Sequence, residues 1–195
     1  MRKIKGFKLA LRPAEIKRRA KRAGLDLAAL GLDEAGLQGF LAQVSKAIAP
    51  GVLFETFKHA DANADPDADT LSPIPGLAYS MVLATLGPDF TPAKEKARVS
   101  AAEMNALWDI VETAAIEETV RFATALLEED AGKESCTLSP WNAIQEPALL
   151  ETVLRKLDGA KIEVHLRDGR LEPAPATAVS LSWLAQSRAR KPKKD

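Results

Sequence analysis

Apolar side chains recur along this chain at two spacings, one typical of helices and one typical of strands. The longest helical pattern covers residues 101–130, where apolar side chains recur every three or four positions. Its stripe consists of Met104, Trp108, Val111, Ala115, Phe122 and Leu126. Ser100 and Glu103 form a capping-box pair before this stripe, because their side chains can satisfy free backbone N–H groups at a helix start. The sequence therefore predicts one long helix near the middle of the chain.

Shorter helical patterns lie on both sides of the long one. The first begins at Pro13 and ends at Gly24, which fits the preference of proline for a helix start and of glycine for a helix end. A second covers residues 33–49, and a third begins at Pro147 and ends at Gly159. These patterns predict two helices before the central one and a single helix after it.

Strand patterns occupy much of the remaining chain. They cover residues 4–11, 51–57, 77–86, 162–166 and 179–183. Asp168-Gly169 predicts a hairpin turn, and residues 59–76, rich in Asp, Ala and Pro, predict a loop. Because helices and strands mix without a strict βαβ alternation, we predict an α+β fold with a long central helix on a mainly antiparallel sheet. We expect a single domain at 1–187 and a basic disordered tail at 188–195.

Composition narrows the class of protein. Hydrophobic residues make up 46% of 195 residues, enough for a packed core. Cys136 is the only cysteine, so an internal disulfide and a cysteine-rich metal site are both excluded. Lysines interrupt the N-terminal segment, and no stretch approaches the roughly 20 apolar residues of a membrane span. We therefore expect a soluble, cytoplasmic protein with no membrane partner.

The formal net charge of zero conceals a segregation of charge. Residues 1–24 hold ten Lys/Arg against Glu15 alone, a net of +9, and residues 188–195 carry a net of +4. The segment 25–187 therefore carries −13. Two basic ends on an acidic body suit an acidic partner or nucleic acid. A solvated helix face and a frayed tail explain the same charges, and we favour this interpretation over nucleic-acid binding because charge runs alone seldom specify a ligand.

Signals for metal binding and side-chain catalysis are weak. Residues 61–69 place Asp or Asn at every second position, as in a calcium loop. Pro66 and Ser72 stand where that loop needs glycine and glutamate, so a solvated acidic loop is the better interpretation. His59 and His165 have no spacing that implies a shared metal site. Phosphate loops, dinucleotide fingerprints and serine-nucleophile motifs are missing, so catalysis by side chains is not predicted.

Several short segments occur in a characteristic order. They are Ala84-Thr85-Leu86-Gly87-Pro88, Asp109-Ile110-Val111-Glu112-Thr113-Ala114-Ala115-Ile116-Glu117, Leu138-Ser139-Pro140-Trp141-Asn142-Ala143-Ile144-Gln145, and residues 171–182. In that order the chain resembles the activation domain of cobalamin-dependent methionine synthase, and more closely its small stand-alone relatives. The resemblance implies an α+β fold around a twisted antiparallel sheet. It also implies a shallow groove that holds S-adenosylmethionine and presents the methyl group to an oxidised corrinoid.

Under this resemblance the chain is an accessory protein of corrinoid-dependent methyl transfer. Cobalamin is reached only through a partner, which is a corrinoid protein or a methionine synthase that lacks its own activation domain. With one electron from a reductase, the cobalt is remethylated and returned to service. Because the cofactors supply the chemistry and the protein supplies orientation, no catalytic side chain is expected.

The resemblance also implies a position for the site, between the turn at 137–145 and the exposed side of the long helix. Glu117 is its expected polar contact, and the opposite wall is formed by Thr137, Ser139, Trp141 and Asn142. Trp141 can stack on a purine there. Two structural alternatives remain open, in which Glu117 simply pairs with Arg121 and Trp141 is buried beneath the turn.

The turn departs from the family's pattern at two points. Thr137 stands where the family has an arginine, and no Gly-Tyr pair lies between Pro140 and Trp141. Loss of an arginine that pairs with a carboxylate costs about 1.5–3 kcal/mol. The alternative function is therefore a non-catalytic interaction module that kept the scaffold and lost S-adenosylmethionine.

Overall fold

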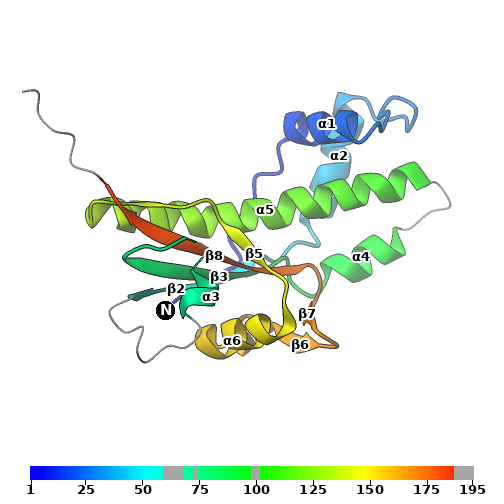
Figure 1. The fold of residues 1–195 in the computed structure, drawn as a ribbon. Helices are drawn as coiled ribbons and strands as arrows, with labels where there is room; N and C mark the ends of the chain where they lie inside the picture. Colours follow the sequence, from blue (N-terminus) through cyan, green and yellow to red (C-terminus); the bar gives the residue numbers. More distant parts are fainter. Residues whose placement is uncertain (59–67, 73, 98–101, 187–195) are drawn as a thin grey trace, which may run out of the picture.

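A computed structural model describes residues 1–58, 68–72, 74–97 and 102–186 of the chain. In chain order its elements are β1 (Arg2–Lys5), α1 (Pro13–Arg22), α2 (Glu34–Ser45), β2 (Gly51–Lys58), α3 (Ala68–Leu71), β3 (Ala78–Thr85), α4 (Phe90–Lys96), α5 (Ala102–Lys133), β4 (Cys136–Leu138), β5 (Asn142–Ile144), α6 (Pro147–Leu157), the 3-10 helix η2 (Gly159–Ile162), β6 (His165–Arg167), β7 (Arg170–Glu172) and β8 (Ala176–Ala185). The fold is α+β, with the long helix α5 packed on an antiparallel sheet, and this confirms the predicted class (Figure 1).

The main sheet has the strand order β1-β2-β3-β8-β4, and β5 also pairs with β8. β3 is buried along its whole length, which accounts for its continuous apolar sequence, because a strand covered on both faces has no solvent side. β8 pairs with β3 along one edge. Along its other edge, Ala178 to Ser180 pair with β5 and Trp183 to Ala185 pair with β4, so the turn between these two short strands lies beside β8.

Helices cover both faces of this sheet. α5 lies along one face, and α6 with the β6–β7 hairpin lies on the other (Figure 1). On the α5 side, Val120, Ala123 and Leu127 are buried against apolar side chains of the central strands. On the other side, Val153 and Leu157 of α6 are buried in a second apolar cluster. The sheet is therefore the middle layer of three.

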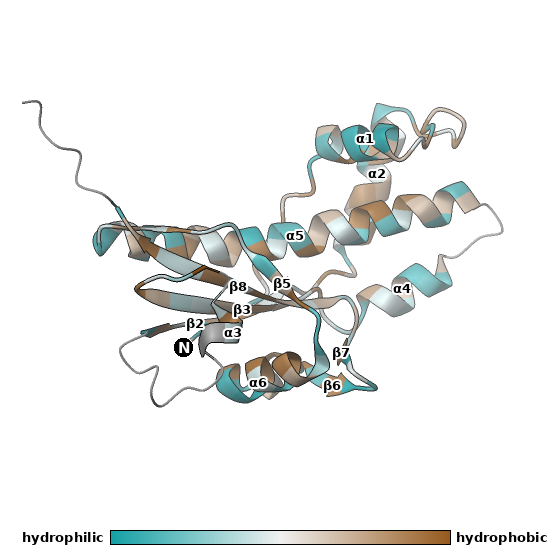
Figure 2. Cartoon of the chain, in the orientation of Figure 1, coloured by the Kyte–Doolittle hydropathy of each residue, from teal (hydrophilic) through white to brown (hydrophobic). Residues whose placement is uncertain are grey.

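The first half of α5 packs mainly against other helices, α1, α2 and α4. This third cluster includes buried Ile16, Leu37, Phe90 and Trp108. α1 lies on the far side of α5 from the sheet, and most of its residues are hydrophilic (Figure 2). The face that α5 buries therefore changes along its length, from these helices to the sheet. For that reason the predicted stripe is buried at Trp108, Val111 and Ala115 but only half-buried at Phe122 and Leu126.

Several predicted boundaries in the first half of the chain are wrong. The first strand ends at Lys5 rather than near residue 11, because Gly6 has a φ of 68° and turns the chain away. The ring of Phe7 then stacks on that of Phe122, with centroids 4.0 Å apart. The second helix ends at Ser45 rather than at residue 49. Helices α3, within the predicted loop at 59–76, and α4 were not predicted at all, because each is short and buries a single large side chain.

The predicted strand at 162–166 is wrong over its first half. Ile162 ends the 3-10 helix η2, and Glu163 follows with a φ of 62°. Ile162 and Val164 are both buried, so a tight turn reproduces the alternation that suggested a strand. The hairpin turn at Asp168-Gly169 is confirmed, with φ values of 50° and 75°. Ser100, His59 and the acidic segment 61–67 lie outside the described residues.

Candidate functional site

A groove of about 600 Å³ lies between α5 and the turn that joins β4 to β5. Its lining residues are Arg121, Thr124, Ala125, Glu128, Leu138, Ser139, Pro140, Trp141 and Leu181. Leu138 and Leu181 belong to the apolar cluster between α5 and the sheet, so they supply the apolar lining. The charged groups come from α5 and the aromatic ring comes from the turn. This groove is our candidate site.

Ser139 holds the turn beside β8. Its backbone N–H donates to the carbonyl of Ser182 at 2.9 Å, and its hydroxyl accepts from the backbone N–H of Ser182, also at 2.9 Å. The same hydroxyl donates to the carbonyl of Pro140. Because Ser139 is 95% buried and its hydroxyl is committed to these bonds, it shapes the wall of the groove. Trp141, in contrast, is 37% exposed and is not covered by the turn.

Two of the residues expected in this wall lie elsewhere. Thr137 is paired with Leu184, and Asn142 with Ser180. Neighbouring residues on a strand point to opposite faces, and paired residues share a face. Because Leu181 faces α5, Asn142 opposite Ser180 faces away from α5, and Thr137 does likewise. Neither residue is among those that line this groove, so the structure places only Ser139 and Trp141 of the expected wall in it.

Glu117 also lies outside the groove. Its carboxylate accepts a hydrogen bond of 2.6 Å from Arg19 of α1, and Arg19 donates a second one to Glu15 at 2.9 Å. Glu117 thus connects α5 to α1. The alternative in which Glu117 pairs with Arg121 is wrong as well, because Arg121 donates to Glu118 instead, at 2.6 Å.

The same contacts, within α1 and between α1 and α5, shift the pKa values of Arg19 and Glu15. The hydrogen bond to Glu117, together with the one to Glu15, raises the pKa of Arg19 above its ordinary value. The hydrogen bond from Arg19, with the charge of Arg18 nearby, lowers the pKa of Glu15. Both groups are therefore charged at neutral pH, and the junction is an ion-pair network rather than a proton-transfer site.

The polar residues that do line the groove from α5 were missed. Arg121 and Glu128 are seven residues apart, which places them on one face of the helix and about 10 Å apart along its axis. Glu128 has no ion pair within the described part of the chain. A helical-wheel comparison would have found this pair, because both residues flank the buried Thr124 and Leu127. The resemblance implied Glu117 instead, because this glutamate ends the 109–117 segment.

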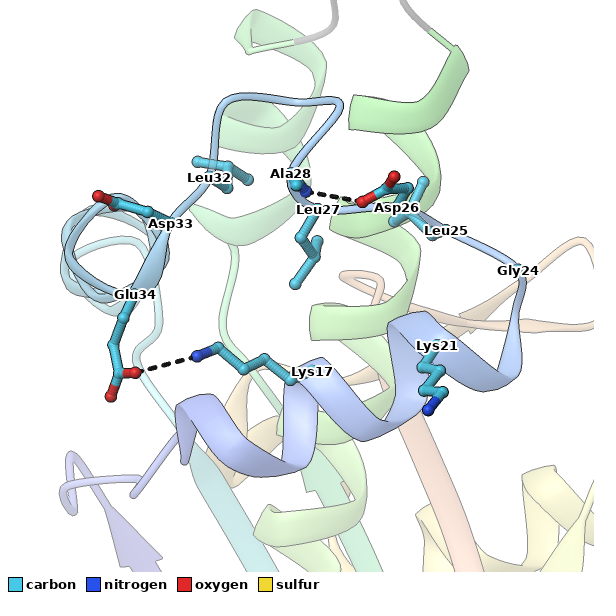
Figure 3. Close-up of a pocket in the computed structure, with 10 residues that line it drawn as sticks. All are labelled: Lys17, Lys21, Gly24, Leu25, Asp26, Leu27, Ala28, Leu32, Asp33 and Glu34. Atoms are coloured by element: carbon cyan, nitrogen blue, oxygen red, sulfur yellow. Dashed lines mark hydrogen bonds and ion pairs between the residues drawn. The ribbon is translucent and has the colours of Figure 1, made fainter.

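A second hollow, of about 540 Å³, lies between α1 and the segment that leads to α2 (Figure 3). Leu27 points into it above Lys17, whose ammonium pairs with Glu34 at 3.2 Å (Figure 3). Asp26 accepts from the backbone N–H of Ala28, so this carboxylate holds the loop. Because Lys17 is paired with Glu34 and Asp26 accepts from a backbone N–H, we assign no chemistry to this hollow.

No cluster of three or more His, Cys, Asp or Glu side chains that suits a metal ion occurs in the described ranges. Within those ranges, every helix is too short or too polar to cross a bilayer. Among known proteins, no family model matches the chain, and no curated protein matches it either.

Proposed function

We propose that this chain is an accessory protein of corrinoid-dependent methyl transfer and that it holds S-adenosylmethionine in the groove between α5 and the turn at 138–141. The observation that carries the proposal is the lining of that groove. It combines a guanidinium, a carboxylate and an indole around an apolar surface. Its volume of about 600 Å³ lies within the range of small-molecule pockets, about 300–1,000 Å³.

Each polar group has a matching part in S-adenosylmethionine. Arg121 suits the carboxylate of the methionyl group, because guanidinium–carboxylate pairs form charge-assisted hydrogen bonds. This arginine comes from α5 and replaces the one that the resemblance would place at Thr137. Trp141 offers an aromatic face to the adenine ring. Glu128 can accept hydrogen bonds from the ribose hydroxyls, and its charge favours the cationic sulfonium over a neutral thioether.

The proposed role is to position the ligand. Arg121 and Trp141 would fix the two ends of the ligand, which is sufficient when the reacting groups belong to the cofactors. The sulfonium supplies the methyl group, and the corrinoid belongs to a partner protein. Trp141 is exposed, so the groove is accessible to such a partner from solvent. A corrinoid protein or a methionine synthase without its own activation domain is the partner that this role requires.

Calorimetry with S-adenosylmethionine tests the proposal. A dissociation constant below about 100 μM, equivalent to roughly −5.5 kcal/mol, supports it. Arg121→Gln is expected to weaken binding about ten- to a hundredfold, because one charge-assisted hydrogen bond contributes about 1.5–3 kcal/mol. Arg170→Gln on β7 is the matched control and leaves the affinity unchanged. S-adenosylhomocysteine, which lacks the positive charge near Glu128, binds more weakly than S-adenosylmethionine.

The competing function is a non-catalytic interaction module on the same scaffold. The observation in its favour is the turn, where Thr137 faces away from the groove and no residues separate Pro140 from Trp141. Absence of measurable heat at millimolar S-adenosylmethionine contradicts the first proposal and supports this second one.

A further inference from the structure

A smaller hollow lies where the start of α1 crosses α5, next to the groove. Its volume is about 120 Å³. The charged groups that line it are Arg12, Arg18, Arg19, Arg121, Glu15 and Glu118. We call it the arginine hollow. Arg121 lines both the arginine hollow and the groove, so the two are neighbours along α5.

Positive charge exceeds negative charge in the arginine hollow. Glu15 pairs with both Arg18 and Arg19, and Glu118 pairs with Arg121. Arg12 has no ion pair within the described part of the chain. Four guanidinium groups therefore meet two carboxylates at the lining, and the hollow keeps a net positive charge even when Glu117, the other partner of Arg19, is included.

The arginine hollow has one fixed arginine and three available ones. Arg19 is held by two carboxylates, and its side chain is 23% exposed. The side chains of Arg18 and Arg121 are both 58% exposed, and each pairs with a carboxylate three residues away on its own helix. Exposed pairs of this kind contribute little to stability, so a stronger anion can displace the carboxylate. Ile16 of α1 is buried in the apolar cluster that includes α5, so the folded chain already holds these arginines around the hollow.

We infer that the arginine hollow binds a phosphate group, either as free phosphate or as a phosphate monoester. Guanidinium groups match phosphate oxygens with paired hydrogen bonds, and several arginines around one anion are a recurrent solution for phosphate recognition. A volume of about 120 Å³ has room for one phosphate group but not for a nucleoside, so the rest of an ester would lie outside it. This inference does not depend on S-adenosylmethionine binding, because only Arg121 is common to both sites.

A titration followed by nuclear magnetic resonance tests the inference. Inorganic phosphate and phenyl phosphate are added at constant ionic strength while the arginine side-chain N–H resonances are recorded, and acetate is the control anion. We expect saturable shifts with a dissociation constant on the order of 1 mM for phosphate. Tighter binding of phenyl phosphate identifies a monoester as the ligand class, and equal binding identifies free phosphate. Shifts that do not saturate, or an equal response to acetate, overturn the inference.

Variants show whether phosphate binds in the arginine hollow. They also distinguish phosphate binding from S-adenosylmethionine binding in the groove. Arg12→Gln and Arg18→Gln change exposed side chains, and each is expected to weaken phosphate binding about tenfold. Arg170→Gln again serves as the control and leaves phosphate affinity unchanged. Unchanged affinity in both Arg12→Gln and Arg18→Gln overturns the inference. Trp141→Ala removes a wall of the groove only, so it should impair S-adenosylmethionine binding and spare phosphate binding. The two proposals therefore fail independently.

Discussion

Replacement of Glu117 by glutamine tests whether this residue connects two helices or contacts a ligand. In the structure its carboxylate receives a 2.6 Å hydrogen bond from Arg19, and the two side chains are 36% and 23% exposed. Glutamine keeps the shape of the side chain and removes its charge. Arg19 retains its hydrogen bond to Glu15, which limits the loss. We therefore expect Glu117→Gln to destabilise the protein without unfolding it.

The size of this loss of stability follows from how exposed the Arg19–Glu117 ion pair is. Removing one partner of a fully buried ion pair costs about 3–5 kcal/mol, whereas exposed pairs contribute about 0–1 kcal/mol. A pair that is about a third exposed and keeps a second carboxylate belongs near the lower range, so we expect about 1 kcal/mol. In a chain of this size that corresponds to a fall in Tm of about 2–4 °C. A double-mutant cycle with Arg19→Met, followed by urea denaturation, isolates the coupling between the two side chains.

Two results would refute this reasoning. The first is a coupling free energy below about 0.3 kcal/mol, which is within the error of additivity for independent sites. The second is a tenfold loss of S-adenosylmethionine affinity in Glu117→Gln with unchanged stability. That second result would make Glu117 a ligand contact and would move the site away from the groove lined by Arg121 and Trp141.

Three further predictions concern stability. Leu127→Ala opens a cavity between α5 and the sheet, where Leu127 is 1% exposed, and should lower the free energy of unfolding by about 2–5 kcal/mol in urea denaturation; a loss below about 1 kcal/mol would contradict the packing described. Gly76→Ala places a Cβ atom 2.5 Å from the carbonyl oxygen of Trp183 and should cost about 1–3 kcal/mol. Gly39→Ala in α2 places a Cβ atom with nothing within 4 Å apart from its chain neighbours and the helix's own backbone, so it should be neutral or stabilising. Arg19 lowers the pKa of Glu15 below its usual 4.5, so Glu15 stabilises the fold above that pH, and the contribution is lost as pH falls through the lowered pKa. Glu15→Gln should therefore lose less stability than the parent chain between about pH 5 and pH 3, and equal losses would exclude this linkage.

The fold was predictable where local sequence and tertiary packing agree. The central helix, the continuous apolar strand β3 and the turn at Asp168-Gly169 follow directly from periodicity and turn chemistry. Prediction failed where tertiary contacts decide the outcome. Ile162 and Val164 alternate like strand residues because both are buried, yet the chain between them turns through Glu163. The short strands β4 and β5 depend on pairing with β8, which lies far away in the sequence.

The candidate site was only partly predictable for the same reason. Sequence order drew attention to the turn that contains Ser139 and Trp141, and both residues line the groove. The orientation of Thr137 and Asn142 depends on their register with β8, which the sequence does not reveal. The contact of Glu117 depends on where α1 packs, because Arg19 of α1 is its partner.

The turn between β4 and β5 can change in length without disturbing the strand pairing on either side of it. On one side Ser139 is anchored to Ser182, and on the other Asn142 is in register with Ser180. Residues added between Pro140 and Trp141 would therefore extend a surface connection without shifting either ladder, and lengthening such a loop costs only about 0.6 kcal/mol per doubling. Insertions at this point, in evolution or by engineering, can therefore change the shape of the groove. The ligand that the groove binds can change while the rest of the fold stays the same.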